Sequence, residues 1–214
     1  MYNVSKMLLV ASIPPDGNLK MFSLPDLFSK LESHQLGIRD LKAIVRTKIS
    51  GSRLNQTFRH ALLIRGNKAI RLETYNFFRQ VLSVLVYDGK KTLMYDPRKN
   101  LIIDGEKAWH IMHQVMGGHV NFKKYISIFS GGIPRFSHLR AKALKRDPDQ
   151  LVYQIEAVDR ETDEHMLIEI DIYTLLPKSV VLTRGAKEIY RIYWDDYRKV
   201  DQWDFPYRVI IEFR

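Results

Sequence analysis

The sequence predicts a mainly β (α+β) protein, an unclosed, strongly curved antiparallel β-barrel of about eleven strands with helices plugging its open mouth. Most of the chain alternates apolar and polar residues with a period of two, and short turn signals separate the runs. Sustained helical spacing inside the chain is confined to residues 107–134. The run Val81–Tyr87 is apolar on both faces, so the sheet needs cover on both sides. A long twisted antiparallel sheet must curl, which favours a half-closed barrel.

The length of the chain fits one domain after a short N-terminal arm. The 214 residues are 45% hydrophobic, which is ordinary for a globular domain with a real core. Residues 1–22 contain the turn signal Pro14-Pro15-Asp16-Gly17 and no periodic pattern, so we expect an arm there. A single domain is expected over residues 23–214, with a helical lid inserted at 107–134.

The first regular element is a helix, followed by a run of strands. Ser23 is a predicted N-cap, with Pro25 and Asp26 in the first turn, and Leu36-Gly37 is a predicted end. The pattern then changes to a period of two. Six strands are expected over residues 41–49, 56–65, 68–75, 81–87, 92–95 and 101–103.

Two short apolar helices are expected next. Trp109, Met112 and Met116 follow helical spacing, and after Gly117-Gly118 the spacing resumes. The second group comprises Phe122, Tyr125, Ile126 and Phe129. Gly131-Gly132 and Pro134 end it, and both glycine pairs are candidate hinges. A polar, basic loop is expected over residues 135–150. Five more strands are then expected over residues 151–158, 165–173, 179–184, 188–194 and 205–213.

The chain is strongly basic and lacks cysteine. Its formal net charge is +10, which favours nucleic acid, an anionic membrane or an acidic protein as partner, or is simply a solvated basic surface. Nucleic acid ranks last because the basic residues are spread along the chain rather than arrayed with aromatics. The absence of cysteine excludes disulfides, thiol catalysis and Cys-metal sites.

Signals for catalysis are weak. His110 and His113 lie three apart in a helical pattern, but no carboxylate or third histidine stands near them in the sequence. The chain contains no phosphate-binding loop, dinucleotide fingerprint or nucleophile elbow. We therefore predict a protein that is not an enzyme, with no catalytic residue, metal site or cofactor.

Four segments resemble the LolA/LolB family of lipoprotein carriers and receptors. Residues 86–97 (VYDGKKTLMYDP) resemble the strand–turn–strand signature of the carrier. Residues 71–79 are similar to the part of the receptor that carries its projecting loop, and residues 116–134 to its helical segment, which ends in a Gly-x-Pro element. Asp195-Asp196-Tyr197 with Phe205-Pro206 resembles the last receptor hairpin. The resemblance spans residues 24–214 and is closer to LolB-like lipoproteins.

The resemblance implies a non-catalytic protein that binds lipid or lipoprotein acyl chains in a cavity and carries or receives them at the outer membrane. Its implied partners are those chains, the inner leaflet of the outer membrane and a carrier protein. It implies a periplasmic location with an N-terminal lipid anchor, although the signal and the anchor cysteine are absent from this chain. The expected cavity and lid residues are Leu82, Val84, Val86, Trp109, Met112, Met116, Phe122, Tyr125, Ile126 and Phe129.

Two further roles come from the same resemblance. Phe77 and Phe78 match the receptor's membrane-inserting loop, with Phe77 in place of the family's proline and Arg79 in place of its glycine. The residues alone allow the two rings to be buried in a wide bulge as readily as exposed. Arg65 matches the carrier's lid-contacting arginine, with Gly66 in place of a proline.

Two other functions stay open on the same fold. One is a structural or interaction module whose interior is filled by side chains. The other is an enzyme acting on a hydrophobic small molecule, which a histidine or carboxylate with a perturbed pKa inside the cavity would favour.

Overall fold

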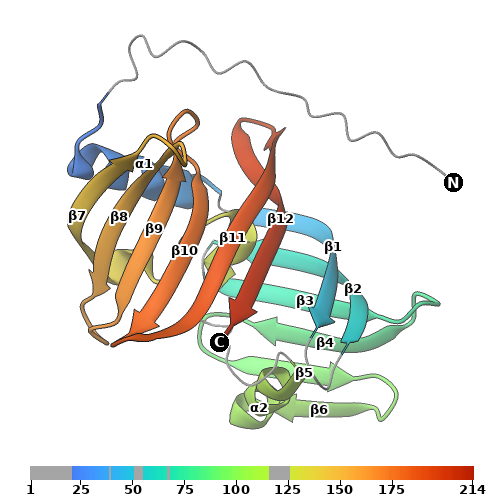
Figure 1. The fold of residues 1–214 in the computed structure, drawn as a ribbon. Coiled ribbons are helices and arrows are strands. Elements are labelled where there is room, and N and C mark those ends of the chain that lie inside the picture. Colours follow the sequence, from blue (N-terminus) through green and yellow to red (C-terminus); the bar gives the residue numbers. More distant parts are fainter. Residues whose placement is uncertain (1–20, 39, 51–54, 67, 116–125) are drawn as a thin grey trace, which may run out of the picture.

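Two six-stranded antiparallel sheets make up most of the protein (Figure 1). The computed structural model describes residues 21–38, 40–50, 55–66, 68–115 and 126–214. Sheet A has the order of the chain: β1 (Asp40–Ser50), β2 (Asn55–Arg65), β3 (Ala69–Tyr75), β4 (Val81–Tyr87), β5 (Thr92–Asp96) and β6 (Leu101–Asp104). Sheet B contains β7 (Leu139–Asp147), β8 (Val152–Asp159), β9 (His165–Asp171), β10 (Pro177–Arg184), β11 (Lys187–Val200) and β12 (Trp203–Phe213).

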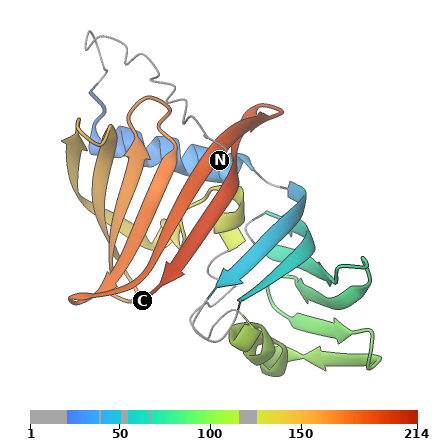
Figure 2. The same ribbon diagram turned by 45° about the vertical axis from the view of Figure 1, so that its right-hand side comes forward.

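The two sheets form a curved, unclosed structure, as predicted. Each strand pairs with its neighbours in the chain, so each sheet is a meander. Strand β1 is an edge of sheet A and β12 an edge of sheet B, and these edges approach without hydrogen-bonding to each other (Figure 1). The short 3-10 helix η2 (Ile126–Ser130) lies between the sheets (Figure 2). The predicted mainly β, open-barrel class is therefore confirmed, with twelve strands rather than about eleven.

The first helix forms for the reason that the sequence suggests. Helix α1 (Leu24–Gly37) begins at Ser23, whose hydroxyl accepts from the backbone N–H of Asp26 while the Asp26 carboxylate accepts from Ser23. Its buried side chains, Leu27 and Leu31, pack on sheet B. Helix α2 (Gly105–Val115) follows β6 and contacts β5 and β6. No helix among the described residues combines the length and hydropathy of a membrane span.

The inner face of sheet B is a filled core. Ile155, Ile168, Val180 and Ile192 stand opposite one another in register on four neighbouring strands, and all four are fully buried. Helix α1 and the short helix η3 (Phe136–His138) cover them, and the Phe28 and Phe136 rings stack at 4.7 Å. Eighteen buried residues belong to this one cluster. Sheet B thus supplies most of the hydrophobic stabilisation.

The expected polar loop over residues 135–150 is wrong, because most of it forms η3 and β7. Strand β7 pairs only with β8 and is an edge strand. Edge strands commonly carry charged residues that oppose pairing with other chains, which explains the basic sequence. A register shift between Ala141 and Ala143 also breaks the alternation that would have revealed a strand.

Strand β11 is longer than the expected 188–194. Asp196 has a left-handed φ of 54°, but the pairing runs from Asp195–Arg208 to Tyr197–Pro206 without a shift, so the strand continues past it. Two consecutive acidic residues, which are typical of a turn, therefore stand inside a strand.

Gly37 should be intolerant of substitution. A Cβ atom at this position would overlap the Trp203 ring at the start of β12, so one of the two must move. We expect Gly37→Ala to lower the free energy of unfolding by about 1–3 kcal/mol in urea denaturation. The control is Leu36→Ala at an exposed neighbouring position, for which a change below about 0.5 kcal/mol is expected. Equal effects of the two variants would contradict the proposed contact.

Candidate functional site

The face of sheet A that looks toward η2 is the candidate site, and we call it the inner wall. The strand register places Ala43, Leu62, Leu72, Leu85 and Met94 opposite one another on five successive strands. A second row beside it runs through Leu41, Ile64, Ile70 and Tyr87. These two rows give the wall an almost wholly apolar surface.

The inner wall is only partly covered, in contrast to sheet B. Its cluster with η2 contains four buried residues, compared with eighteen in the sheet B core. Leu41, Val45, Leu72 and Tyr87 are half-buried. Apolar side chains that keep part of their surface in water can gain free energy from a further apolar contact.

Two of the expected cavity residues on β4, Val84 and Val86, lie on the face of sheet A that points away from η2. Leu85 is buried on the inner wall opposite Leu72, and side chains alternate along a strand. Val84 and Val86 therefore point to the other side of sheet A, which we call the outer face, whereas Leu82 is the extra residue at the register shift of β4 against β3. The prediction was wrong because Val81–Tyr87 is apolar on both faces and its period gives no direction.

The helix η2 fills the space between the two sheets. Ile126 is buried against Leu62, Ile64 and Ile70 of the inner wall, and Phe129 is half-buried in the same cluster. Ile128 belongs instead to the sheet B core, where its carbonyl accepts a 3.0 Å hydrogen bond from the Trp194 indole. Both residues were expected to line a cavity as part of the lid, and that role stays a prediction.

The other lid residues lie outside the described part of the structure. Met116, Phe122 and Tyr125 and the candidate hinge Gly117-Gly118 are among residues 116–125, and the side chains of Trp109 and Met112 are also not described. Ala108 of α2 is described and fully buried.

Gly131 and Gly132 have a packing role. Gly131 has a φ of 77°, and a Cβ atom there would stand 3.0 Å from the Pro206 ring. A Cβ on Gly132 would stand 3.0 Å from the carbonyl of Ser127. Close approach of neighbouring groups thus accounts for both glycines, which follow η2. The next residue ties this segment to α1, because the Ile133 N–H donates a 3.1 Å hydrogen bond to Gln35.

A polar row borders the apolar wall, and no sequence motif predicted it. His60, Thr74 and Ser83 lie opposite one another on β2, β3 and β4, at the side nearest the β3–β4 turn. The Nδ1 atom of His60 shares a 3.1 Å hydrogen bond with the Thr74 hydroxyl. Burial lowers the pKa of His60 from 6.5 to about 4, so the ring is neutral at neutral pH. The sequence did contain one signal for this row, because His60 lies in the same phase of the strand pattern as the apolar residues Leu62 and Ile64.

His60 should make the fold sensitive to mild acid. Its pKa is lower in the folded than in the unfolded chain, so protonation opposes folding as the pH falls from about 6.5 toward 4. We expect His60→Leu to remove about 3 kcal/mol of this loss, measured by urea denaturation across that range. His165→Leu, which changes an exposed histidine, is measured in the same way as a control for the substitution itself. A His60→Leu profile parallel to wild type would count against the buried neutral ring.

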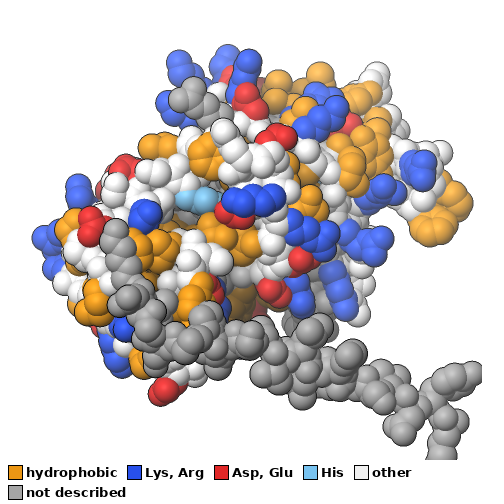
Figure 3. Space-filling view, turned by 90° about the horizontal axis from the view of Figure 1, so that it is seen from above, with side chains coloured by type: hydrophobic (Ala, Val, Ile, Leu, Met, Phe, Trp, Pro, Cys, Tyr) orange, Lys and Arg blue, Asp and Glu red, His pale blue; other side chains and the backbone are white. Residues whose placement is uncertain are grey.

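The Phe77-Phe78 pair projects from the β3–β4 turn. The two side chains are 94% and 79% exposed, and their rings meet edge to face with centroids 5.6 Å apart. Arg79 follows with a left-handed φ of 63°, which lets the turn close without the glycine of the resembling family. Figure 3 shows hydrophobic side chains projecting at the end of the molecule where Figure 1 places this turn. Of the two arrangements considered from the sequence, the structure has the exposed one.

Arg65, the predicted lid contact, lies on the outer face of sheet A. It is exposed at the end of β2 and shares the phase of Leu63, which is on the outer face. Because Arg65 points to the outer face, its side chain lies on the opposite side of sheet A from η2. Residues 116–125 of the proposed lid lie outside the described residues, so the lid contact of Arg65 stays a prediction.

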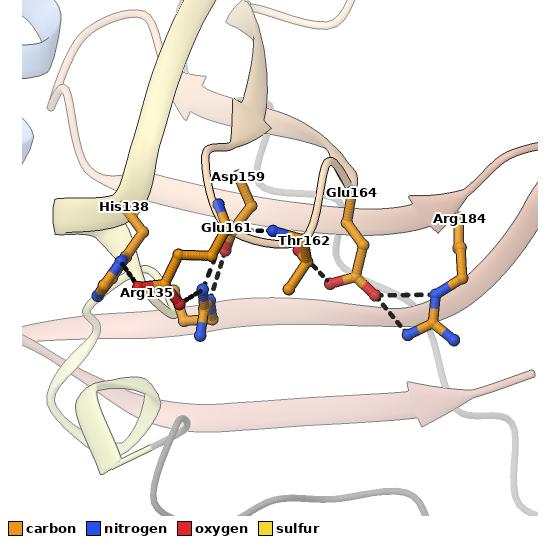
Figure 4. Close-up of polar contacts among 7 residues, drawn as sticks. All are labelled: Arg135, His138, Asp159, Glu161, Thr162, Glu164 and Arg184. Atoms are coloured by element: carbon orange, nitrogen blue, oxygen red, sulfur yellow. Dashed lines mark hydrogen bonds and ion pairs between the residues drawn. The ribbon is translucent and has the colours of Figure 1, made fainter.

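An ion-pair network anchors the end of the helical insert to sheet B (Figure 4). The Arg135 guanidinium donates two hydrogen bonds to the buried Asp159 carboxylate and one, of 2.7 Å, to Glu161. His138 adds a 3.0 Å contact to Glu161. Backbone N–H groups of Glu161 and Thr162 also donate to Asp159. These donors, led by Arg135, lower the pKa of Asp159 from 3.8 to about 2.

The Asp159 network should contribute stability that strong acid removes. Since the folded pKa is lowered, the contribution is present above about pH 4 and is lost as the pH falls toward 2. Asp159→Asn should cost about 2 kcal/mol at neutral pH, and the gap to wild type should close near pH 2 in urea denaturation. Glu161→Gln, at an exposed partner of the same arginine, is the control and should cost less. A gap for Asp159→Asn that persists at pH 2 would contradict this explanation.

The described residues contain no group of three His, Asp or Glu side chains that could hold a metal ion. His60 is hydrogen-bonded to Thr74, and no carboxylate is hydrogen-bonded to it within the described ranges. The His60–Thr74 pair therefore lacks the carboxylate that orients the histidine base in known nucleophilic sites.

Comparisons with known proteins identify the fold. No protein-family model matches the chain, and no curated protein matches it significantly. The crystal structure of a LolA superfamily protein from Nitrosomonas europaea matches with a TM-score of 0.60 and 10% identity, over 90% of this chain and 86% of that one. At this identity the likeness shows a LolA-like fold alone. A complex of the CwlD amidase with the GerS lipoprotein from Clostridioides difficile matches over 85% of this chain and 98% of that one, at 8% identity. Its TM-score of 0.32 is too low to indicate a shared fold.

Proposed function

We propose that this protein binds lipid acyl chains on the inner wall of sheet A and carries or receives them, without chemical change. The half-covered apolar wall is the observation that carries the proposal. The fold it shares with a LolA superfamily protein supports it. An acyl chain would cover side chains, such as Leu41, Val45 and Leu72, that η2 leaves partly exposed.

The free energy of burying an acyl chain on this wall suits transfer of the chain to and from a membrane. Each CH₂ group of an acyl chain gains roughly 0.8 kcal/mol on leaving water, and a bilayer offers a similar gain. A protein that moves lipids must bind the chain about as well as the membrane does, so that a small bias sets the direction. An apolar wall with few polar anchors meets this requirement because it supplies contact area without fixed hydrogen bonds.

The helical insert is the proposed lid. Ile126 and Phe129 already pack on the inner wall, and a bound chain would compete with them for Ile64 and Ile70. Trp109, Met112, Met116, Phe122 and Tyr125 are proposed to face the same chain. The Arg135–Asp159 network would hold the far end of the insert in place while its near end moves.

The projecting Phe77-Phe78 turn is the proposed membrane contact. Two exposed phenylalanines at the tip of a hairpin are costly in water and favourable at a bilayer interface. The polar row of His60, Thr74 and Ser83 lies at the same end of sheet A, where the polar linkage of an acylated ligand would sit. A periplasmic location, a lipid anchor and exchange with a partner carrier protein complete the proposal.

His60 is the observation that favours a second candidate, an enzyme acting on a hydrophobic ester. Its neutral ring beside a hydroxyl lies on the apolar wall, where such a substrate would bind. Release of the fluorescent group from a fatty-acyl ester, lost in His60→Ala, would establish this alternative over simple binding.

Val45 and Ile44 provide a matched test of acyl-chain binding. They are adjacent on β1 and point to opposite faces, Val45 to the inner wall and Ile44 to the outer face. Titration with a fluorescent fatty acid should show about tenfold weaker binding for Val45→Asp, because a carboxylate would oppose burial of the chain. Ile44→Asp should bind as the wild type does.

Two results would contradict the proposal. One is the absence of fatty-acid binding by the wild-type protein together with no lipid detected by mass spectrometry after purification. The other is an equal loss of binding in Val45→Asp and Ile44→Asp with both variants folded by circular dichroism, which would place any binding elsewhere.

A further inference from the structure

The outer face of sheet A carries exposed apolar side chains that the acyl-binding proposal does not use. One row across the sheet contains Ile44, Val84, Tyr95 and Ile102, and the row beside it contains Leu63, Val86 and Leu93. Ile44 is 64% exposed and Ile102 is 68% exposed, at opposite edges of the sheet. Leu63, Leu93 and Tyr95 are also exposed. These side chains reach from β1 to β6 and are interrupted at β3 by the Arg71–Glu73 ion pair, so they exceed the scattered hydrophobic residues of an ordinary surface.

Basic residues lie among these apolar side chains. Lys42, Arg46 and Lys48 lie on the same exposed side of β1 as Ile44. Arg46 stands directly opposite Arg59 on β2. Two like charges in register destabilise a strand pair unless an anion lies close to both. None of these four cations has a carboxylate partner within the part of the chain that the structure describes.

The net charge of the protein is concentrated in sheet A. Residues 40–104 contain 13 Lys and Arg against five Asp and Glu, whereas residues 139–214 contain 13 against 15. Among the described residues, the ion pairs of sheet A are Arg71–Glu73 and Arg98–Asp96. The other ion pairs lie within residues 135–214. Sheet A therefore presents unneutralised positive charge, and sheet B does not.

We infer that the outer face of sheet A docks on an anionic phospholipid surface. Aliphatic side chains interleaved with cations match the boundary between acyl chains and anionic headgroups, where each Lys or Arg adds attraction. Figure 3 shows Lys and Arg interleaved with hydrophobic side chains on the side of the molecule that sheet A occupies. A second copy of the chain fits poorly, because two basic faces would repel each other.

Docking on this face also orients the molecule. The Phe77-Phe78 turn leaves the same sheet, so it reaches the bilayer when the outer face lies along it. The inner wall then opens away from the headgroups except at the end nearest the turn. The docking face is the opposite face of the sheet from the proposed acyl site, so docking does not depend on acyl-chain binding.

The test is co-sedimentation of the whole chain with phosphatidylcholine vesicles, with and without phosphatidylglycerol, at low and high salt. Wild-type protein should bind the anionic vesicles at low salt and release at high salt. Lys42→Glu/Arg46→Glu should weaken binding about tenfold or more. Lys178→Glu/Lys187→Glu, at exposed positions of sheet B, makes the same net charge change and should weaken it much less.

A second pair of variants tests the apolar part. Ile44→Ser/Ile102→Ser should reduce binding severalfold, and Leu36→Ser, at an exposed position of α1, should not. Folding of each variant is checked by thermal melting. Fatty-acid binding is measured in parallel and should stay at the wild-type level in all outer-face variants.

Several outcomes would overturn the inference. The wild-type protein could fail to bind anionic vesicles, or the sheet A and sheet B charge variants could lose vesicle binding equally. Loss of vesicle binding only in Phe77→Ser/Phe78→Ser would assign docking to the turn alone. Concentration-dependent self-association of the wild type that Ile44→Ser/Ile102→Ser abolishes would assign the face to a second copy. Failure of fatty-acid binding with intact vesicle docking would remove the proposed function and leave this inference standing.

Discussion

The architecture depends on the five residues of η2, which pack between the two sheets. The sheets share no hydrogen-bonded strand pair within the described residues, so side-chain packing must hold them together. Ile126 enters the cluster of sheet A, and Ile128 enters the core of sheet B two residues later. The Trp194 indole fixes the backbone of this turn by donating to the Ile128 carbonyl. A 3-10 turn sends side chains at i and i+2 to different sides, which one strand of a shared sheet could not do.

Sheet B supplies most of the stability, and sheet A supplies the surfaces proposed for binding. Sheet B buries a continuous core and carries nearly balanced charges, and the Arg135–Asp159 contact secures the insert. Sheet A buries much less, leaves cations unpaired and shows apolar side chains on both faces. Because proteins are only marginally stable, exposed apolar area is kept where binding needs it and removed elsewhere. The LolA-like fold therefore combines a well-packed half, which supplies stability, with a half whose surfaces are available for binding.

The sequence was sufficient for the elements that local chemistry determines. The Ser23 capping box, eleven of the twelve strands and the open-barrel class follow from capping, period and turn signals. Strand β7 was not predicted because its charged residues, which suit an edge strand, resemble a loop and a bulge breaks its alternation. The inward face of β4 could not be read from a run that is apolar on both sides. His60 and the Asp159 network join residues that only the tertiary structure brings together, and a single sequence does not carry that information.

The contiguity of each sheet in the chain has a consequence for dynamics. Every strand pairs with its sequence neighbour, so sheet A is complete within residues 40–104 and can open without breaking a single ladder of sheet B. Local unfolding of this kind needs to disrupt only the small cluster around Leu62 and Ile126, so its free-energy cost is low. We therefore expect amide hydrogens to exchange faster in sheet A, which carries the proposed acyl-binding wall, than in sheet B. If the inner wall binds acyl chains as proposed, local opening of sheet A, and not motion of a hinge alone, would set how quickly a chain enters or leaves.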